Sequence, residues 1–178
     1  MRHTGHEAML RRRLTNFSYT TDKCHFVGQS AMSELSLIFE HLGGRKALGK
    51  PVWKSTLELH RSIVSGLPVR CVIYFKEHTG LSNLHMCEAL GVSEKTFIRW
   101  QDDPASLLDP VYSDRLVRTA KIMGLAQEVL EDGDNAREWL SKPQSALGNE
   151  VPQDLLSTDI GAKQVEDLLL QMEHGYLA

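Results

Sequence analysis

Apolar residues recur at intervals of three and four along most of this chain, the spacing that places them on one face of an α-helix. No stretch alternates apolar and polar residues convincingly with the period of two that a half-buried strand requires. The pattern predicts helices over residues 33–42, 54–65, 69–80, 113–130, 135–141 and 159–175. The expected fold class is therefore all-α.

Glycine and proline mark the breaks between these helices. Gly43 and Gly44 are expected to end the first helix, because glycine adopts the positive φ that a helix C-terminus favours. The polar, proline-containing composition of residues 101–110 predicts a loop. The helix over 54–65 is expected to bury Leu57, Ile63 and Val64.

Residues 84–100 have the pattern of a helix-turn-helix. Cys87 lies four residues before Gly91, where the two helices would cross and only a small side chain fits, and Gly91 allows the sharp turn. Ser93 can cap the second helix through its side-chain oxygen. The side chains expected on the buried side are Leu84, Leu90, Phe97 and Trp100.

This arrangement leaves the start of the second helix exposed, as is needed for insertion into the major groove of DNA. The predicted DNA-binding residues are Ser93, Glu94, Lys95, Thr96, Ile98 and Arg99. Glu94, Lys95, Ile98 and Arg99 would face the DNA, while the two hydroxyl side chains could reach phosphates or base edges. The alternative is a buried helix pair with no role in nucleic-acid binding.

The long helix that follows is expected to begin at Ser113, a residue type that caps helices, with Asp114 at the positive end of the helix dipole. Arg115 and Arg118 would contact either DNA phosphates or a nearby acidic side chain.

The formal net charge of −3 hides a gradient along the chain. Residues 1–65 hold 10 basic against 5 acidic residues, residues 66–121 hold 7 against 7, and residues 122–178 hold 3 against 11. The basic N-terminal part would attract phosphates, and the acidic C-terminal part would be repelled by them. The two ends of the chain are therefore expected to face different partners.

The C-terminal part carries glycine, proline and tryptophan in a fixed order that helical packing alone does not explain. Its motifs are Ser113-Asp-Arg-Leu116, Ala136-x-x-Trp139-Leu140, Leu147-Gly148-x-x-x-Pro152, Leu155-Leu156-x-Thr158-x-x-Gly161 and Leu168-Leu169-x-x-x-Glu173-x-Gly175. Over residues 66–178 this order resembles the Xre/MbcA/ParS-type antitoxins. The resemblance implies an Xre-like helix-turn-helix followed by a small helical domain that binds and neutralises a RES-type toxin, which consumes NAD. It also implies repression of the protein's own operon through binding to operator DNA.

The last helix is expected to pack through a core stripe of Val165, Leu168, Leu169, Met172 and Tyr176. Leu170 and Leu177 fall on another side, and an apolar pair outside the core stripe suggests a surface for a partner. Gly175 would end the helix and leave the last three residues as an arm. The predicted toxin-binding residues are therefore Leu170, Glu173, Gly175, Tyr176, Leu177 and Ala178.

Three domains are expected: an N-terminal tail and helix over 1–50, with oligomerisation as one candidate role, a helix-turn-helix domain over 51–121, and a toxin-binding domain over 122–178. The histidines are dispersed, and the glycines form neither a dinucleotide-binding nor a phosphate-binding loop. Both observations argue against an enzyme, and no cofactor is expected. Three cysteines without a CxxC pair give no zinc site.

No long apolar run or signal sequence is present, so a cytoplasmic protein without a membrane role is expected, acting as a homodimer. Two alternatives remain open at this point. One is a helix-turn-helix transcription regulator whose C-terminal domain dimerises or senses a ligand, and the other is a helical adaptor without a DNA role.

Overall fold

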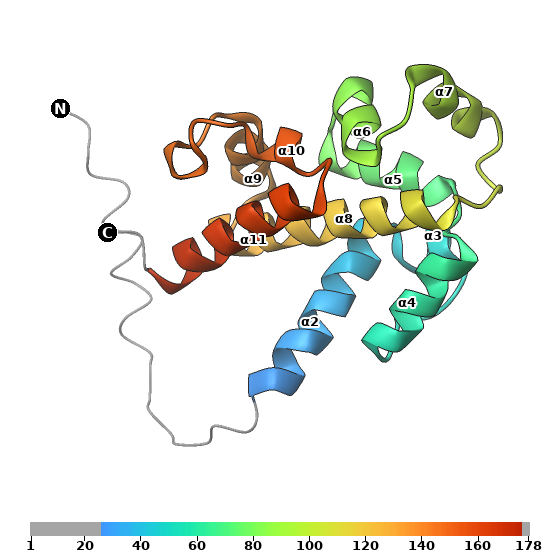
Figure 1. The fold of residues 1–178 in the computed structure, drawn as a ribbon. Coiled ribbons are helices and arrows are strands. Elements are labelled where there is room, and N and C mark those ends of the chain that lie inside the picture. The colour runs from blue at the N-terminus through green and yellow to red at the C-terminus, as the bar shows by residue number, and fades with distance from the viewer. Residues whose placement is uncertain (1–25, 176–178) are drawn as a thin grey trace. The chain divides into compact units, whose positions relative to one another are not determined.

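The computed structural model describes the backbone of residues 26–175 and the side chains of residues 34–175. The regular elements in this range are α2 Phe26–His41, α3 Gly44–Leu48, α4 Thr56–Ser65, α5 Arg70–Thr79, α6 Asn83–Leu90, α7 Glu94–Asp102, α8 Pro110–Leu130, α9 Gly133–Ser141, the 3-10 turn η1 Ser145–Leu147, α10 Pro152–Leu155 and α11 Asp159–His174 (Figure 1). The predicted all-α class is confirmed, since extended pairing in this range is limited to the isolated bridges Pro68–Leu107 and Gln144–Glu150. No helix in the described part of the chain is long and apolar enough to cross a membrane.

The long helix α8 lies at the centre of the residues that form the core. It packs against α4, α6, α9 and α11, and its inward side chains are fully or almost fully buried: Leu116, Ala120, Ile122, Met123 and Ala126. Two ion pairs show that α8 and α11 run in the same direction. Arg118 pairs with Asp159 at the start of α11, and Lys121, further along α8, pairs with Glu166, further along α11. Both helices therefore end at the same side of the C-terminal part (Figure 1).

The structure extends some predicted helices and adds others. α2 begins at Phe26 rather than at residue 33, and the short helices α3 and α10 fall where no helix was predicted. α8 begins at Pro110, three residues before the predicted start. Ser113 is therefore not a helix cap but a buried residue inside α8, and its Oγ accepts a hydrogen bond from the backbone N–H of Leu67 at 2.9 Å.

The predicted inner face of α4 is wrong at two positions. Leu57 and Val64 are 54% and 56% exposed, whereas Leu59 and Ser62 point inward and Ile63 is partly buried against the core. Ser62 points inward because its Oγ accepts hydrogen bonds from Nε1 of Trp53 at 2.8 Å and from Nζ of Lys50 at 2.6 Å. The indole N–H of a buried tryptophan needs such an acceptor.

The end of α2 and the segment before α4 contribute to the same core. Phe39 and Trp53 meet edge to face with ring centroids 5.6 Å apart. His41 is buried against Phe75 and His78, and burial, followed by the charge of His78, lowers its pKa to about 4. A buried imidazole without a hydrogen-bond partner on Nδ1 is held in its neutral form.

Candidate DNA-binding and toxin-binding surfaces

The turn between α6 and α7 requires glycine for two reasons. Gly91 has a φ of 64°, and its N–H donates to carbonyls in the last turn of α6. A Cβ atom at this position would lie 2.1 Å from Nη1 of Arg115, too close for any side chain without displacing the guanidinium. Cys87 is buried, as the predicted crossing of the two helices requires. The predicted role of Gly91 in the turn is confirmed.

The second helix of the motif begins at the predicted cap. Oγ of Ser93 accepts a hydrogen bond from the backbone N–H of Thr96 at 3.2 Å, and the two hydroxyl oxygens lie 3.0 Å apart. Phe97 is buried on the inner side of α7, and the half-buried Trp100 packs beside it. Both hydroxyl groups thus already stabilise the start of α7.

One side chain of the motif was assigned to the wrong environment. Leu90, Phe97 and Trp100 pack in or against the core as predicted, but Leu84 is 53% exposed. The inward positions of the first turns of α6 are taken by Met86 and Cys87 instead.

The opposite side of α7 faces solvent. Of the six predicted DNA-binding residues, Ser93, Glu94, Lys95, Ile98 and Arg99 are exposed and Thr96 is half-buried. Glu94, three residues before Phe97, is exposed in the first turn but does not lie opposite to Phe97. Lys95, Ile98 and Arg99 lie on the side of the helix away from Phe97, because residues three and four apart share one face. This side combines two cations and one apolar side chain at the start of an exposed helix.

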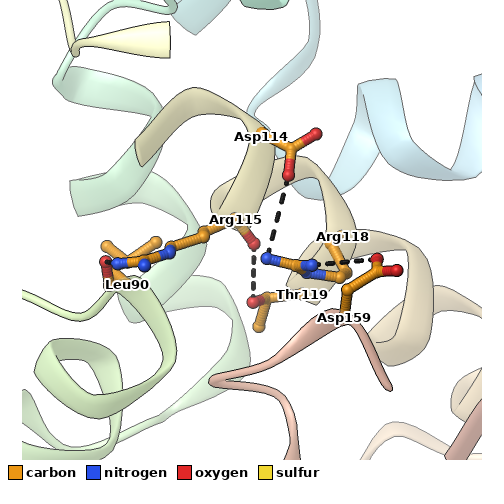
Figure 2. A network of polar contacts seen from close by, with 6 residues as sticks. All are labelled: Leu90, Asp114, Arg115, Arg118, Thr119 and Asp159. Atoms are coloured by element: carbon orange, nitrogen blue, oxygen red, sulfur yellow. Dashed lines mark hydrogen bonds and ion pairs between the residues drawn. The ribbon is translucent and has the colours of Figure 1, made fainter. Parts of the chain in front are cut away.

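The two arginines of α8 contact protein groups on both sides of the helix (Figure 2). Nη1 of Arg115 donates to the carbonyl oxygen of Leu90 at 2.7 Å, at the end of α6. Nη1 of Arg118 lies 3.0 Å from Oδ1 of Asp159, and its Nη2 lies 3.7 Å from Asp114. The sequence spacing indicates the contact with Asp114, four residues away, but not the one with Asp159, which is 41 residues distant.

The last helix has the predicted buried face. Val165, Leu168 and Leu169 are buried and Met172 packs against them. Leu170 is half-buried outside this group, and Glu173 and Gly175 are exposed, with Gly175 ending the helix at a φ of 71°. The other predicted toxin-binding residues, Tyr176, Leu177 and Ala178, lie outside the described residues. The structure thus places Leu170 and Glu173 on one side of α11, three residues apart.

The start of α11 accounts for one of the C-terminal motifs. Oγ1 of Thr158 accepts a hydrogen bond from the N–H of Gly161 at 3.1 Å. A Cβ atom on Gly161 would lie 2.2 Å from the backbone carbonyl oxygen of Leu155. The Thr-x-x-Gly spacing is therefore a capped helix start that lies directly against α10.

Acidic side chains meet where α8 and α11 end. Burial, and then the charge of Glu173 on α11, raise the pKa of Glu128 on α8. The C-terminal ends of both helices carry a partial negative charge of their own. This end of the C-terminal part therefore repels anions and attracts cationic groups.

The described cysteines behave as core side chains. Cys71 and Cys87 are free and buried, and burial raises the pKa of both, that of Cys71 to about 12. In the described range no group of three or more histidine, cysteine or carboxylate side chains is arranged to hold a metal ion.

The fold and these two surfaces define a helical protein in which a helix-turn-helix module is followed by a second helical binding module. Comparison with protein families gives the same division. Residues 58–121 match the antitoxin Xre-like helix-turn-helix domain, and residues 125–175 match the antitoxin Xre/MbcA/ParS C-terminal toxin-binding domain. The two matches together cover most of the chain.

Individual relatives agree with these matches. The chain is 29% identical over 126 residues to the antitoxin Xre of Pseudomonas putida, covering 71% of this chain and 77% of that protein. It is 28% identical to the antitoxin Xre of Yersinia enterocolitica, covering 73% of this chain and 87% of the relative. A 75-residue region is 37% identical to the Prs ADP-ribosylating antitoxin of a Sphingobium species, covering 37% of this chain and 47% of that protein.

The chain belongs to the Xre/MbcA/ParS family of antitoxins. It is an antitoxin, not an enzyme, and its C-terminal domain binds a toxin. Its helix-turn-helix domain is of the kind that binds DNA.

Proposed function

We propose that this antitoxin neutralises a RES-type, NAD-consuming toxin and represses its own operon by binding promoter DNA. The DNA-binding role is supported chiefly by the solvent-facing side of α7, where Lys95 and Arg99 lie beside Ile98 with Phe97 buried behind them. Such a helix can enter the major groove with its N-terminal residues against base edges. The proposed DNA-contacting set is Ser93, Glu94, Lys95, Thr96, Ile98 and Arg99.

Two observations support the proposed partner of the C-terminal domain. Residues 122–178 carry 3 basic against 11 acidic residues, which favours a partner with a basic surface, such as a protein that binds an anionic nucleotide. The name of the Sphingobium relative associates that protein with ADP-ribosylation, a reaction that takes ADP-ribose from NAD. The proposed toxin-contacting set is Leu170, Glu173, Gly175, Tyr176, Leu177 and Ala178.

The protein is proposed to act in the cytoplasm as a homodimer. A single α7 offers few cations, so two copies on paired half-sites would provide the affinity that one copy lacks. The proposed domains are residues 1–50, with a role in oligomerisation, 51–121 for DNA and 122–178 for the toxin.

DNA binding is tested with the double variant Lys95→Ala/Arg99→Ala and the region upstream of the coding sequence as probe. The variant should lose most of its affinity and show a weaker salt dependence than the unaltered chain, because fewer counterions are released. Lys142→Ala is the matched control, since this lysine pairs with Glu138 on α9, away from α7. Equal affinity of the double variant and the control would contradict the assignment of α7.

Toxin neutralisation is tested by co-expression with the product of the neighbouring gene. Cells making that product alone should lose NAD and stop growing, and the full chain should preserve both. Leu170→Asp and a chain ending at Gly175 should each protect less well, whereas Gln164→Asp, on another face of α11, should protect fully. Growth arrest without NAD loss would rule out the proposed toxin class while leaving the antitoxin role intact.

A further inference from the structure

The stretch from α3 to the start of α5 carries basic side chains that no carboxylate neutralises. Residues 45–70 hold six lysines and arginines against a single acidic residue, Glu58. The Glu58 carboxylate accepts a hydrogen bond from the backbone N–H of Lys54 at 2.8 Å. Within residues 34–175, none of the six cations lies within ion-pair distance of a carboxylate. We name this group the α3–α4 basic surface, and its members are Arg45, Lys46, Lys50, Lys54, Arg61 and Arg70.

Basic side chains later in the chain are used differently. Of the six lysines and arginines in residues 110–175, Arg115 donates to the carbonyl of Leu90. The other five pair with carboxylates: Arg118, Lys121, Arg137, Lys142 and Lys163. Six neighbouring cations without such a pair create a positive potential that attracts an anionic partner.

Contacts among α3, α4 and α5 hold the basic surface together. Nε of Arg70 donates to the carbonyl of Ala47, and its guanidinium lies over the end of α3, because a Cβ atom on Gly49 would be 3.4 Å from Nη2. Nζ of Lys50 donates to Oγ of Ser62 on α4 at 2.6 Å. The four remaining side chains are exposed: Arg45, Lys46, Lys54 and Arg61. Three elements therefore contribute to one positive surface.

The α3–α4 basic surface lies at the same end of α8 as the DNA-reading helix. Helices α3, α4 and α7 lie by the N-terminal half of α8, whereas α9 lies by its C-terminal half (Figure 1). The backbone N–H of Arg70 donates to the carbonyl of Pro104 at 3.0 Å, in the loop that follows α7. Along this connection the exposed Asp102 and Asp103 come between the basic surface and the cations of α7. The molecule thus has two separate basic surfaces at one end.

We propose that the α3–α4 basic surface binds backbone phosphates of duplex DNA beside the base pairs that α7 contacts. This proposal rests on the proposed DNA-binding role of α7 and adds a second contact to it. In some helix-turn-helix proteins the C-terminal end of the reading helix contacts the DNA backbone, and the basic surface adjoins the loop after that end. Its cations release counterions from DNA and so provide affinity that residues 66–121, with 7 basic against 7 acidic residues, lack. Contacts to phosphate position the protein and carry no base specificity.

The test compares the unaltered full chain with the triple variant Arg45→Ala/Lys46→Ala/Lys54→Ala on the DNA upstream of the coding sequence. These three side chains are exposed and make no hydrogen bond within the described residues, so the fold should be unchanged. We expect about tenfold weaker binding, and a slope of log affinity against log salt that is smaller by about 2–3, or about 0.9 for each lost phosphate contact. Hydroxyl-radical footprinting should show lost protection at the outer edges of the bound site and retained protection at its centre.

The matched control is Arg137→Ala/Lys142→Ala/Lys163→Ala, which removes the same charge from ion-paired positions in the C-terminal part. It should keep the salt slope and the footprint of the unaltered chain. The proposal is overturned if the first triple variant has the slope of the control, or if it loses central and outer protection alike. Weaker binding of that variant to duplex RNA, but not to the upstream DNA, would assign the surface to RNA and also overturn the proposal. Failure of the unaltered chain to bind the upstream DNA would instead overturn the proposed function, and this contact with it.

Discussion

Replacing Ser113 with alanine should destabilise the fold by removing the acceptor of a buried backbone N–H. Oγ of Ser113 accepts from the N–H of Leu67 at 2.9 Å, and both residues are fully buried. Water cannot reach the amide in this position. The Ser113→Ala variant therefore leaves a polar group without a partner in the core.

Two effects of opposite sign set the size of the loss. An unsatisfied buried N–H costs about 1–3 kcal/mol. Alanine inside a helix is better than serine by about 0.5 kcal/mol, which offsets part of this cost. The expected net decrease in the free energy of unfolding is therefore about 1.5 kcal/mol. Ser65→Ala is the control, because Ser65 is exposed and its hydroxyl donates only to the carbonyl of Arg61 in its own helix.

Urea unfolding of both variants measures the difference. Ser113→Ala should shift the midpoint without changing the slope, which reports the surface exposed on unfolding. Ser65→Ala should stay within about 0.5 kcal/mol of the unaltered chain, as surface substitutions usually do. If Ser113→Ala is equally stable, the amide of Leu67 has another acceptor, and the assigned connection between α8 and the segment before α5 is wrong.

Three further predictions concern buried positions. Gly161→Ala should lower the free energy of unfolding by about 2 kcal/mol in a chemical denaturation experiment, because its Cβ would lie 2.2 Å from the backbone oxygen of Leu155. The control Gly133→Ala should change the free energy of unfolding far less, because its Cβ would meet only the end of a flexible side chain. His41 has a folded pKa of about 4, so the unfolded chain takes up the proton first as the pH falls below about 6.5. Stability should then decrease by up to about 3 kcal/mol between pH 6.5 and 4, and His41→Leu should flatten that part of the stability curve; an unchanged slope would show that other groups cause it. Cys71, whose pKa is raised to about 12 by burial, should resist alkylation at pH 8 until the chain unfolds, as peptide mass spectrometry can show; rapid labelling of the native protein would contradict its burial.

The helix-turn-helix could be predicted from the sequence because its determinants are local. Gly91 ends one helix and Ser93 caps the next through contacts with residues at most four positions away. Cys87, four residues before Gly91, is a small side chain buried in the first of these helices. Such features depend little on the rest of the fold, so spacing alone identifies them.

The inner face of α4 could not be predicted because a distant side chain decides it. The helix has apolar residues on two sides, and periodicity offers both. Burial of Trp53 creates a need for a hydrogen-bond acceptor, and Ser62 meets it at 2.8 Å. That requirement turns Leu59 and Ser62 inward and leaves Leu57 exposed. The Arg118–Asp159 pair was missed for the same reason, since its partners lie 41 residues apart.

Most of the large motif residues and the proposed toxin contacts occupy different environments in the C-terminal domain, although Glu173 and Gly175 belong to both sets. The motif residues Ala136, Leu140, Pro152, Leu156 and Gly161 are all buried. They fix how α9, α10 and α11 pack, as the close approach of Gly161 to α10 illustrates. A buried side chain cannot touch a partner unless the domain opens, so these five residues identify the scaffold and not the surface that the toxin covers. The residues that choose one toxin over another must be sought among exposed positions such as Glu173, where substitution leaves the scaffold unchanged.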